Sequence, residues 1–507
     1  MAKVVKKKKK GLKSLRSVGG ASGERGSNLR PHFVEKLPPC RKACPNHNDI
    51  RNMLMTISKA EDYEIPYDKA LEDAFYIFLE TTPFPSVCGR VCPHPCESEC
   101  NRKEKEGAVS INKVERYIGD FGLQNGLAPK KLTDETRSEK IAVIGSGPGG
   151  MTAAYHLARR GYPVTVFEGF PKPGGMLRYG IPQYRLPWDV LDGEINRILD
   201  MGVELKLNTA VGSDVSLDDL RKEYKAIFVA IGAHQGYKLR VAGEDAANVF
   251  TGTDFLHVVI GGGDTAIDAA RVSRRMGADV TILYRRTKTE MPAIDEEIDG
   301  AIEEGINIEF LAAPAEIYTN DGVATGMKCQ RMELGEPDSS GRRRPVPIEG
   351  DTYDLDFTCL IAAVSQEPNF SGFDSLVEGK DWVKVDEKFK TKLDNVYSGG
   401  DNTNLGLVID AIAHGRVAAM AIDEMITGKT MEPSVNGAEP IRTDRMKLSY
   451  YKEAQRVPYK ELPVEDRLTE MHAEIVSTYS QEEATTEAQR CMSCGKCFDC
   501  GTCWSYC

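Results

Sequence analysis

The stretch from Ile141 to Glu168 constrains the fold of this chain more than any other part of its sequence. It opens with apolar residues that predict a buried parallel strand, and an alanine-rich helix and a second apolar strand, Val164–Phe167, follow. A GxGxxG motif joins the first strand to the helix and points the helix N-terminus at a pyrophosphate. Glu168 ends the second strand, where a carboxylate can accept hydrogen bonds from a ribose 2′-hydroxyl. Together these features predict a dinucleotide-binding Rossmann unit.

Each residue of the motif has its own expected task. Gly145 allows the tight turn out of the strand, and Gly147 lets the backbone approach the phosphates. Pro148 and Gly149 stand at the helix N-terminus, and Gly150 lets the helix pack closely on the strand. A glycine-rich turn without a ligand is the alternative, and the surrounding strands and terminal acid disfavour it.

A second glycine motif, at 258–268, predicts a second dinucleotide site. A helix over 267–276 and a strand over Val280–Tyr284 complete its βαβ unit. This strand ends in Arg285 and Arg286, which can hold the 2′-phosphate of NADPH or stack on the adenine of NADH. Two solvated arginines at a strand end are the plainer alternative. The motif residues that we assign to the nucleotide are Gly261, Gly263, Asp264 and Thr265.

Charge and composition narrow the class of partner. The 507 residues suffice for about three domains. The net charge of −11 argues against nucleic acid as the main partner. The lysine-rich residues 1–30 are expected to be a disordered tail rather than a contact for an acidic partner. No apolar run approaches the ~20 residues that span a bilayer and none forms a signal peptide, so we expect a cytoplasmic protein without a membrane span.

The 14 cysteines gather in two regions, Cys40–Cys100 and Cys491–Cys507, which indicates metal ligation rather than a disulfide framework. The regular spacing within 88–100 favours a [4Fe–4S] cluster over zinc. Cys329 and Cys359 are isolated and are expected to be buried as small hydrophobes. The C-terminal run has the CxxCxxCxxxC spacing of ferredoxins. Its expected cluster ligands are Cys497, Cys500, Cys503 and Cys507, with Cys491 and Cys494 as less certain candidates.

These motifs resemble the small (β) subunit of glutamate synthase and its family of NAD(P)H:acceptor iron–sulfur flavoproteins. The matching residues are CRKACP from Cys40, CGRVCP from Cys88, CESEC from Cys96 and GAVSINKVERYIGD from Gly107. The resemblance implies an α/β fold with two Rossmann-like domains, one for FAD and one for NADH or NADPH. It also implies a helical iron–sulfur domain before them and a ferredoxin-like segment after them.

In this family the helical domain holds two [4Fe–4S] clusters. The resemblance maps the ligands of the flavin-proximal cluster onto Cys44, Cys92, Cys96 and Glu115. Of the four cysteines of the other cluster, Cys40 and Cys100 have counterparts here, and the remaining two positions fall near His32 and Glu35. That cluster is therefore absent or has unusual ligands, with Cys88 as one candidate.

The resemblance also supplies flavin contacts outside the first motif. In KPGGMLRYGIP, from Lys172, the glycines Gly174 and Gly175 let the backbone pass close to the flavin. Asp401, after a strand from Asn395, binds a ribityl hydroxyl in such flavoproteins, with a turn or helix-cap residue as the alternative. The further flavin candidates are Met176, Arg178, Gly400, Leu407 and Val408.

The predicted domains follow from these motifs. They are a basic tail (1–30), a helical [4Fe–4S] domain (31–135), a first segment of the FAD-binding domain (136–235), an NAD(P)-binding domain (236–375), a second segment of the FAD-binding domain (376–435), a polar, helix-prone linker arm (436–490) and the start of a ferredoxin-like module (491–507). The strand of the second motif follows Thr253–Leu256 with only His257 between. We therefore expect residues to be missing at 256/257 and after Cys507, and a measured mass above 55.9 kDa.

The expected activity is NAD(P)H:acceptor oxidoreduction, with hydride transfer between the cofactors and no acid–base residue. The run CMSCGKCFDCGTCWSYC resembles the iron–sulfur flavoproteins associated with dissimilatory sulfite reductase. This implies that reductase, or a ferredoxin-like carrier, as the redox partner in sulfur metabolism. The alternatives are the electron-donating small subunit of NADPH glutamate synthase and a non-catalytic electron-transfer subunit. A disulfide reductase is disfavoured, because it would need a redox CxxC beside the flavin and Cys329 and Cys359 are isolated. The sequence leaves open whether the protein forms a homo-oligomer.

Overall fold

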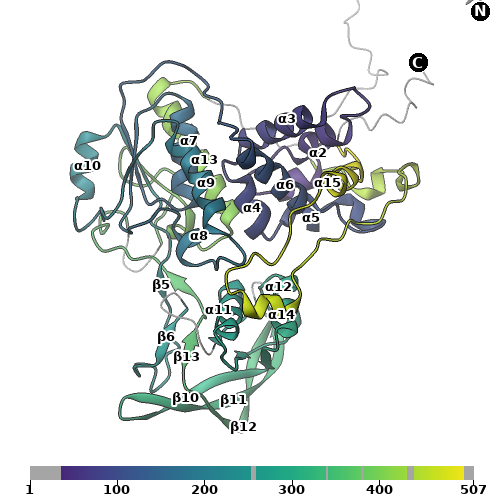
Figure 1. Ribbon diagram of the computed structural model, residues 1–507. Helices are drawn as coiled ribbons and strands as arrows, with labels where there is room; N and C mark the ends of the chain where they lie inside the picture. Colours follow the sequence, from purple (N-terminus) through teal and green to yellow (C-terminus); the bar gives the residue numbers. More distant parts are fainter. Residues whose placement is uncertain (1–35, 253–258, 339–340, 378–381, 431–438, 496–507) are drawn as a thin grey trace, which may run out of the picture. The chain divides into compact units, whose positions relative to one another are not determined.

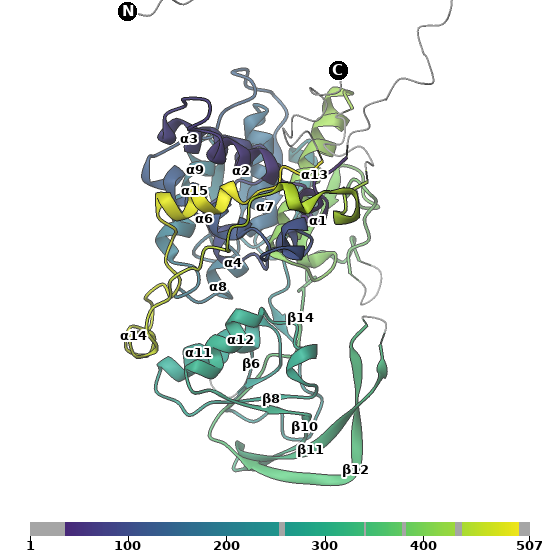
Figure 2. The same ribbon diagram turned by 90° about the vertical axis from the view of Figure 1, so that its right-hand side faces the viewer.

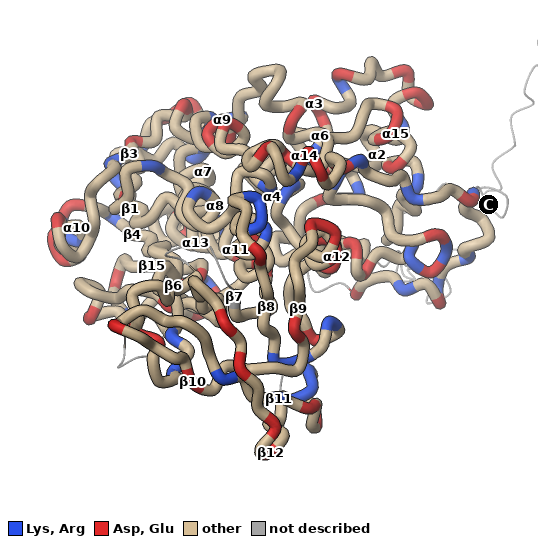
Figure 3. Tube along the Cα trace, turned by 60° about the horizontal axis from the view of Figure 1, so that its bottom comes forward, with Lys and Arg blue, Asp and Glu red and all other residues tan. Residues whose placement is uncertain are grey.

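The computed structural model describes residues 36–252, 259–338, 341–377, 382–430 and 439–495 (Figure 1). Two parallel sheets and a helical N-terminal region make up most of these residues. None of the described helices is long and apolar enough to cross a membrane. Acidic and basic residues are interspersed along the trace (Figure 3).

The N-terminal region consists of short helices packed around a shared apolar core. Glycines let two of them touch: a Cβ on Gly89 would lie 2.4 Å from the Cα of Arg116, and one on Gly119 would lie 2.3 Å from the backbone nitrogen of Ser86. This close packing brings the end of α4 against the middle of α6. The helices are α1 (Pro39–Ala43), α2 (Ile50–Ser58), α3 (Tyr67–Leu79), α4 (Pro85–Val91), α5 (Pro95–Ser98) and α6 (Ile111–Gln124).

The first sheet is parallel, in the order β15-β4-β1-β2-β3. Its central strands are buried along their whole length, which explains their continuous apolar sequences. The apolar run 226–231 continues two residues beyond its strand, which ends at Val229. The strands are β1 (Ile141–Ile144), β2 (Val164–Phe167), β3 (Glu204–Lys206), β4 (Ala226–Val229) and β15 (Val396–Ser398). The associated helices are α7 (Pro148–Arg159), α8 (Met176–Tyr179), α9 (Trp188–Leu199), α10 (Leu217–Glu223) and α13 (Val408–Thr427).

The second sheet is also parallel, in the order β6-β13-β7-β8-β9. Its helix α11 (Asp264–Arg275) begins three residues before the predicted 267–276, at Asp264 directly after the glycine motif. An antiparallel three-stranded sheet lies next to β8 (Figure 2). The remaining elements are β6 (Val249–Thr251), β7 (Val259–Ile260), β8 (Thr281–Tyr284), α12 (Asp295–Glu303), β9 (Asn307–Phe310), β10 (Ala312–Asn320), β11 (Val323–Pro337), β12 (Arg343–Asp356) and β13 (Leu360–Ala362).

A pair of short strands lies between the two sheets, and an arm of C-terminal residues packs on the N-terminal region. Short strands β5 (Gln235–Gly236) and β14 (Gln366–Glu367) pair where the chain passes between the two sheets. Most described residues of the arm lie outside helices and strands, so the helix-prone prediction for 436–490 is wrong over most of its length. Pro463 directly precedes the helix Val464–Thr469 and Pro458 lies in a segment without a helix, since proline lacks the N–H that a helix interior needs. The backbone N–H of Leu462 donates to the carbonyl of Ile475 at 2.9 Å. Its two α-helices are α14 (Val464–Thr469) and α15 (Gln481–Gln489), and α15 packs on α2 and α6.

Candidate flavin, nucleotide and cluster sites

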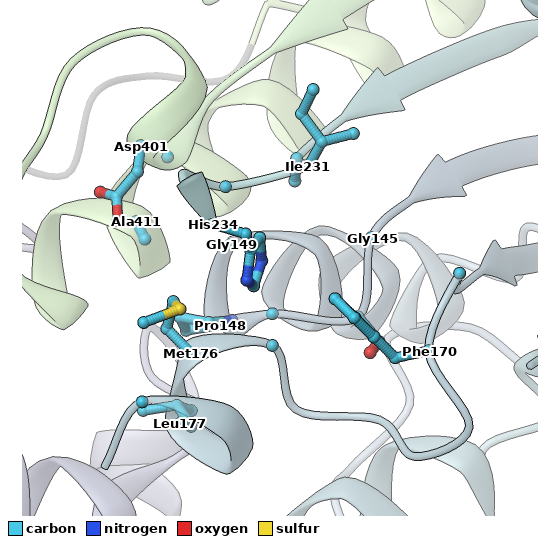
Figure 4. A pocket seen from close by; sticks show the side chains of 18 of the residues that line it. Gly145, Pro148, Gly149, Phe170, Met176, Leu177, Ile231, His234, Asp401 and Ala411 are labelled. Carbon is cyan, nitrogen blue, oxygen red and sulfur yellow. The ribbon is translucent and has the colours of Figure 1, made fainter. Parts of the chain in front are cut away.

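A cavity of about 720 Å³ opens at the carboxyl ends of the strands of the first sheet, where open α/β sheets bind their ligands (Figure 4). Most of the residues that the sequence assigned to FAD line it. They are Gly145, Gly147, Pro148, Gly149, Glu168, Gly175, Met176, Gly400, Asp401, Leu407 and Val408. The cavity therefore gathers residues from both predicted segments of the flavin domain.

Glycines allow the backbone to approach this cavity. Gly145 has a φ of 97°, and a Cβ on Gly150 would lie 2.0 Å from the Gly145 carbonyl oxygen, so α7 packs directly on the turn. A Cβ on Gly175 would lie 2.8 Å from the Cα of Gly147. The two loops thus meet over the cavity through residues without side chains, which leaves room for a pyrophosphate next to the N-terminus of α7.

Glu168 is buried at the end of β2 with both carboxylate oxygens engaged. Oε2 accepts hydrogen bonds from the Ser146 backbone at 3.0 Å and from its hydroxyl, and Oε1 accepts one from the Phe170 backbone at 2.8 Å. A carboxylate has about four acceptor positions, so one remains for a ribose hydroxyl. Sequence reasoning missed Ser146, whose hydroxyl also accepts from the backbone of Gly174 at 3.0 Å and ties the two cavity loops together. Its place inside the glycine motif was the available signal.

Asp401 lies across the cavity, after β15. Its Oδ1 accepts a hydrogen bond from the backbone of Gly406 at 3.2 Å. Burial raises the pKa of Asp401 to about 6, and the nearby Asp410 adds to this effect. The N-terminus of α13 begins at Val408, in the cavity lining, so its free N–H groups are available to a polar ring edge.

Three predicted flavin residues, Gly150, Gly174 and Arg178, lie outside the cavity lining. Gly150 serves the packing described above. Arg178 is buried, pairs with Asp192 and donates to the carbonyl of Pro173 at 3.1 Å, and its guanidinium lies 5.5 Å from the ring of Trp188. Its role in flavin binding stays a prediction.

A second cavity, of about 880 Å³, lies along the second glycine motif. The two arginines after β8 differ there. Arg286 is buried and committed to the protein, since it donates to the carbonyl of Arg343 at 2.7 Å and pairs with Asp338 at 2.8 Å. Arg285 is exposed and forms no ion pair with the described residues. The predicted nucleotide residues that line this cavity are Gly261, Gly263, Asp264, Thr265, Arg285 and Arg286.

The two cavities share some of their lining. Asp264 and Thr265, from the N-terminus of α11, line both, as do Gln366, Gly406 and Leu407. The two cavities are therefore adjacent at the N-terminus of α11.

The flavin cavity also reaches the N-terminal cysteines. Val91 and Pro93, which flank Cys92, are among its lining residues. Burial is the main cause that raises the pKa values of the Cys44, Cys92 and Cys96 thiols, and the charge of Glu115 raises all three further, so these four residues lie close together.

Residues 139–415 match the family described as pyridine nucleotide-disulphide oxidoreductases, and residues 35–127 match the domain described as dihydropyrimidine dehydrogenase domain II, 4Fe-4S cluster. The glutamate synthase [NADPH] small chain of Escherichia coli is 35% identical over 423 residues, which covers 76% of this chain and 88% of that protein. This chain belongs to the glutamate synthase small-chain-like branch of the pyridine nucleotide-disulphide oxidoreductases. It is an FAD- and iron–sulfur-dependent NAD(P)H:acceptor oxidoreductase.

Two further relatives of this oxidoreductase extend over more of the chain. The NADP(+)-dependent formate dehydrogenase subunit beta of Moorella thermoacetica is 34% identical over 530 residues, covering 94% of this chain and 73% of that protein. The NADPH-Fe(3+) oxidoreductase subunit beta of Geobacter sulfurreducens is 34% identical over 522 residues, covering 91% and 76%. The structure of Mycobacterium tuberculosis FprA with NADPH matches with a TM-score of 0.50 at 18% identity, over 58% of this chain and 85% of that one, and shows the fold.

The thiols of Cys44, Cys92 and Cys96 lie beside the flavin cavity, where they can bind a cluster. Glu115 is buried on α6, and its Oε1 has no hydrogen-bond partner among the described residues. Burial raises the pKa of this carboxyl well above its usual value, and the charges of Glu194 and Glu97 add to it. An unpaired buried carboxylate oxygen next to three thiols fits an iron ligand, which would supply the missing partner.

The remaining cysteines of the oxidoreductase divide as follows. Cys88 lies near Cys92 and Cys44, so the alternative that it joins Cys40 is not favoured. Cys329 is buried, and neither it nor Cys359 lines the flavin cavity, which contains no cysteine among its described lining residues. Four cysteines line another small cavity, namely Cys40, Cys100, Cys491 and Cys494. Outside the described residues lie His32, Glu35, the 256/257 junction, Cys497, Cys500, Cys503 and Cys507.

Proposed function

We propose that this oxidoreductase draws electrons from NADPH and delivers them through FAD and a proximal [4Fe–4S] cluster to a protein acceptor. The observation that carries the proposal is the continuity of the sites. The nucleotide and flavin cavities share Asp264 and Thr265, and the flavin cavity reaches the chain on both sides of Cys92. FAD, when bound, accepts hydride from a nicotinamide and releases single electrons.

The chain's own residues bind and orient in this proposal. The glycine loop and the N-terminus of α7 hold the pyrophosphate of FAD, Glu168 accepts from its ribose, and Asp401 accepts from its ribityl chain. The proposed ligands of the proximal cluster are Cys44, Cys92, Cys96 and Glu115. The domain boundaries given above belong to the same proposal.

NADPH is the proposed nucleotide because an unpaired guanidinium is available to its 2′-phosphate. Arg285 is exposed beside the second cavity, whereas Arg286 is held by Asp338. The names of three relatives, which specify NADPH or NADP(+), support this choice.

Anaerobic reduction tests this function. We expect NADPH, added to the purified holoprotein, to bleach the flavin absorbance and to produce EPR signals of reduced clusters, with NADH acting more slowly. If neither nucleotide bleaches the flavin while dithionite reduces flavin and clusters, the chain is a passive electron carrier and the proposal is wrong.

For the acceptor we propose dissimilatory sulfite reductase, on the resemblance carried by CMSCGKCFDCGTCWSYC. The test is NADPH-dependent electron transfer to that purified enzyme, with a ferredoxin and the large subunit of glutamate synthase as alternative acceptors. Faster transfer to either alternative would contradict this assignment and leave the NADPH-to-cluster route intact.

A further inference from the structure

Four cysteines from the two ends of the described chain surround one cavity. Cys40 and Cys100 come from the N-terminal region, and Cys491 and Cys494 follow α15. All four line the same small cavity, together with Asn101, whose side-chain amide contacts the sulfur of Cys494. The remaining lining is mainly apolar and includes Leu54, Val109 and Ile111.

The C-terminal pair is fixed by a buried ion pair that docks it on the N-terminal region. The Arg490 side chain is almost fully buried and donates to the carbonyls of Gly107 at 2.7 Å and Ala108 at 3.0 Å. Its partner Glu487 accepts from the backbone of Ser110 at 2.7 Å. Cys491 follows directly, so these contacts determine where its thiol lies. A buried charged network of this kind is costly unless every group is paired, which gives the docked position a unique register.

The loop after Cys491 also packs closely on the N-terminal region. Gly495 has a φ of 89°, and a Cβ there would lie 2.3 Å from the carbonyl oxygen of Lys36. Asn101, which adjoins Cys100, donates a hydrogen bond of 3.6 Å to the sulfur of Cys494. The same amide donates to the carbonyl of Ile441 at 3.0 Å and so has a fixed orientation.

We propose that Cys40, Cys100, Cys491 and Cys494 together hold a second [4Fe–4S] cluster, completed by the C-terminal segment in place of cysteines near His32 and Glu35. Four thiolates are the usual ligand set of such a cluster. Among the described residues no three His, Cys, Asp or Glu side chains converge as ligands of a single metal ion. A four-iron cluster is bulkier than an ion, so its thiolates ring a cavity. Binding replaces four S–H bonds by four Fe–S bonds and releases four protons.

The cavity also contains groups that tune such a cluster. Arg51 lines it and brings a positive charge to the site. A nearby cation and a hydrogen bond to a ligand sulfur both stabilise the reduced cluster, which carries more negative charge. When bound, such a cluster would accept single electrons that the proposed function draws from NADPH, and this step of the inference rests on that function.

Iron counting in single and double variants tests the site. We expect Cys40→Ser and Cys491→Ser each to lose about four irons and four acid-labile sulfides per chain. The double variant Cys40→Ser/Cys491→Ser should lose the same four, because one cluster cannot be lost twice. The matched comparison is Cys40→Ser/Cys44→Ser, which changes the cysteines at the two ends of α1 and should lose about eight irons. Cys329→Ser should lose none.

Several results would overturn this inference. They are a loss of about eight irons in Cys40→Ser/Cys491→Ser, full iron content in Cys491→Ser, or one zinc per chain instead of iron. Flavin content and NADPH-driven bleaching of Cys491→Ser are measured alongside. Both are expected to be retained in this variant. If the wild type itself contains no flavin or is not bleached by NADPH, the proposed function fails, and that result does not bear on the cluster site. If a serine variant does not fold, Arg51→Gln tests the cluster site instead. It should keep its iron and lower the midpoint potential of one cluster, and an unchanged set of potentials would contradict the site.

Discussion

The backbone N–H of Cys44 donates a 3.1 Å hydrogen bond to the carbonyl of Cys40, so a single turn of α1 separates two thiols with different neighbours. Cys96 and Cys100 are likewise four residues apart at α5, which contacts α1. Four residues of helix rise by about 6 Å. Each element therefore contributes one cysteine to the group beside the flavin and one to the group at the C-terminal segment, and the two proposed clusters are adjacent.

This adjacency predicts magnetic coupling. In protein reduced completely by dithionite, we expect the EPR spectra of the two clusters to be broadened by their spin–spin interaction. Cys491→Ser should leave the narrower spectrum of one isolated cluster from this region. A wild-type spectrum that equals the sum of non-interacting signals would contradict the arrangement.

The proximal site depends on Glu115. Glu115→Ala should lose about four irons, since a buried cavity with three thiols no longer completes the ligand set. Glu115→Cys should retain the iron and change the EPR g-values, because a thiolate replaces a carboxylate. Glu99, a second glutamate of the N-terminal region that is exposed, provides the control: Glu99→Ala should change neither iron content nor spectrum.

Discrimination between the nucleotides should depend on Arg285. Arg285→Gln is expected to raise KM for NADPH about 10- to 150-fold, which corresponds to the loss of a charge-assisted hydrogen bond of about 1.5–3 kcal/mol. It should leave KM for NADH nearly unchanged. Arg286→Gln instead removes the pair with Asp338 and should lower the melting temperature. Equal effects of Arg285→Gln on both nucleotides would show that this arginine contacts the adenine rather than a 2′-phosphate.

Flavin affinity should depend on pH through Asp401. Its pKa in the protein is about 6, raised by burial, and a ribityl hydroxyl donates best to the ionised carboxylate. Flavin binding therefore favours the ionised form, so affinity should rise with pH through about 6 and level off above it, by at most about tenfold per pH unit below 6. Fluorescence titration of the apoprotein with FAD between about pH 5 and 8 measures this. Asp401→Asn should flatten the profile, and a profile unchanged in that variant would exclude Asp401 as its cause.

Local patterns were sufficient for the two nucleotide units. The glycine motifs, apolar strands and terminal Glu168 are determined by residues close together in sequence, and the structure has β1, α7 and β2 in the predicted places. The arm after 436 was misjudged because its conformation depends on pairing with distant backbone rather than on its own polarity.

The sequence by itself determined which residue types are available for each task, and the tertiary structure decided which of them meet. Arg285 and Arg286 are equivalent as letters, but only the fold of β12 and Asp338 commits Arg286 to the protein. Likewise Cys491 was an uncertain ligand in the sequence. It reaches Cys40 because Arg490 and Glu487 dock the C-terminal segment on the N-terminal region. Contacts between residues so far apart follow from packing of the whole chain, which no local spacing encodes.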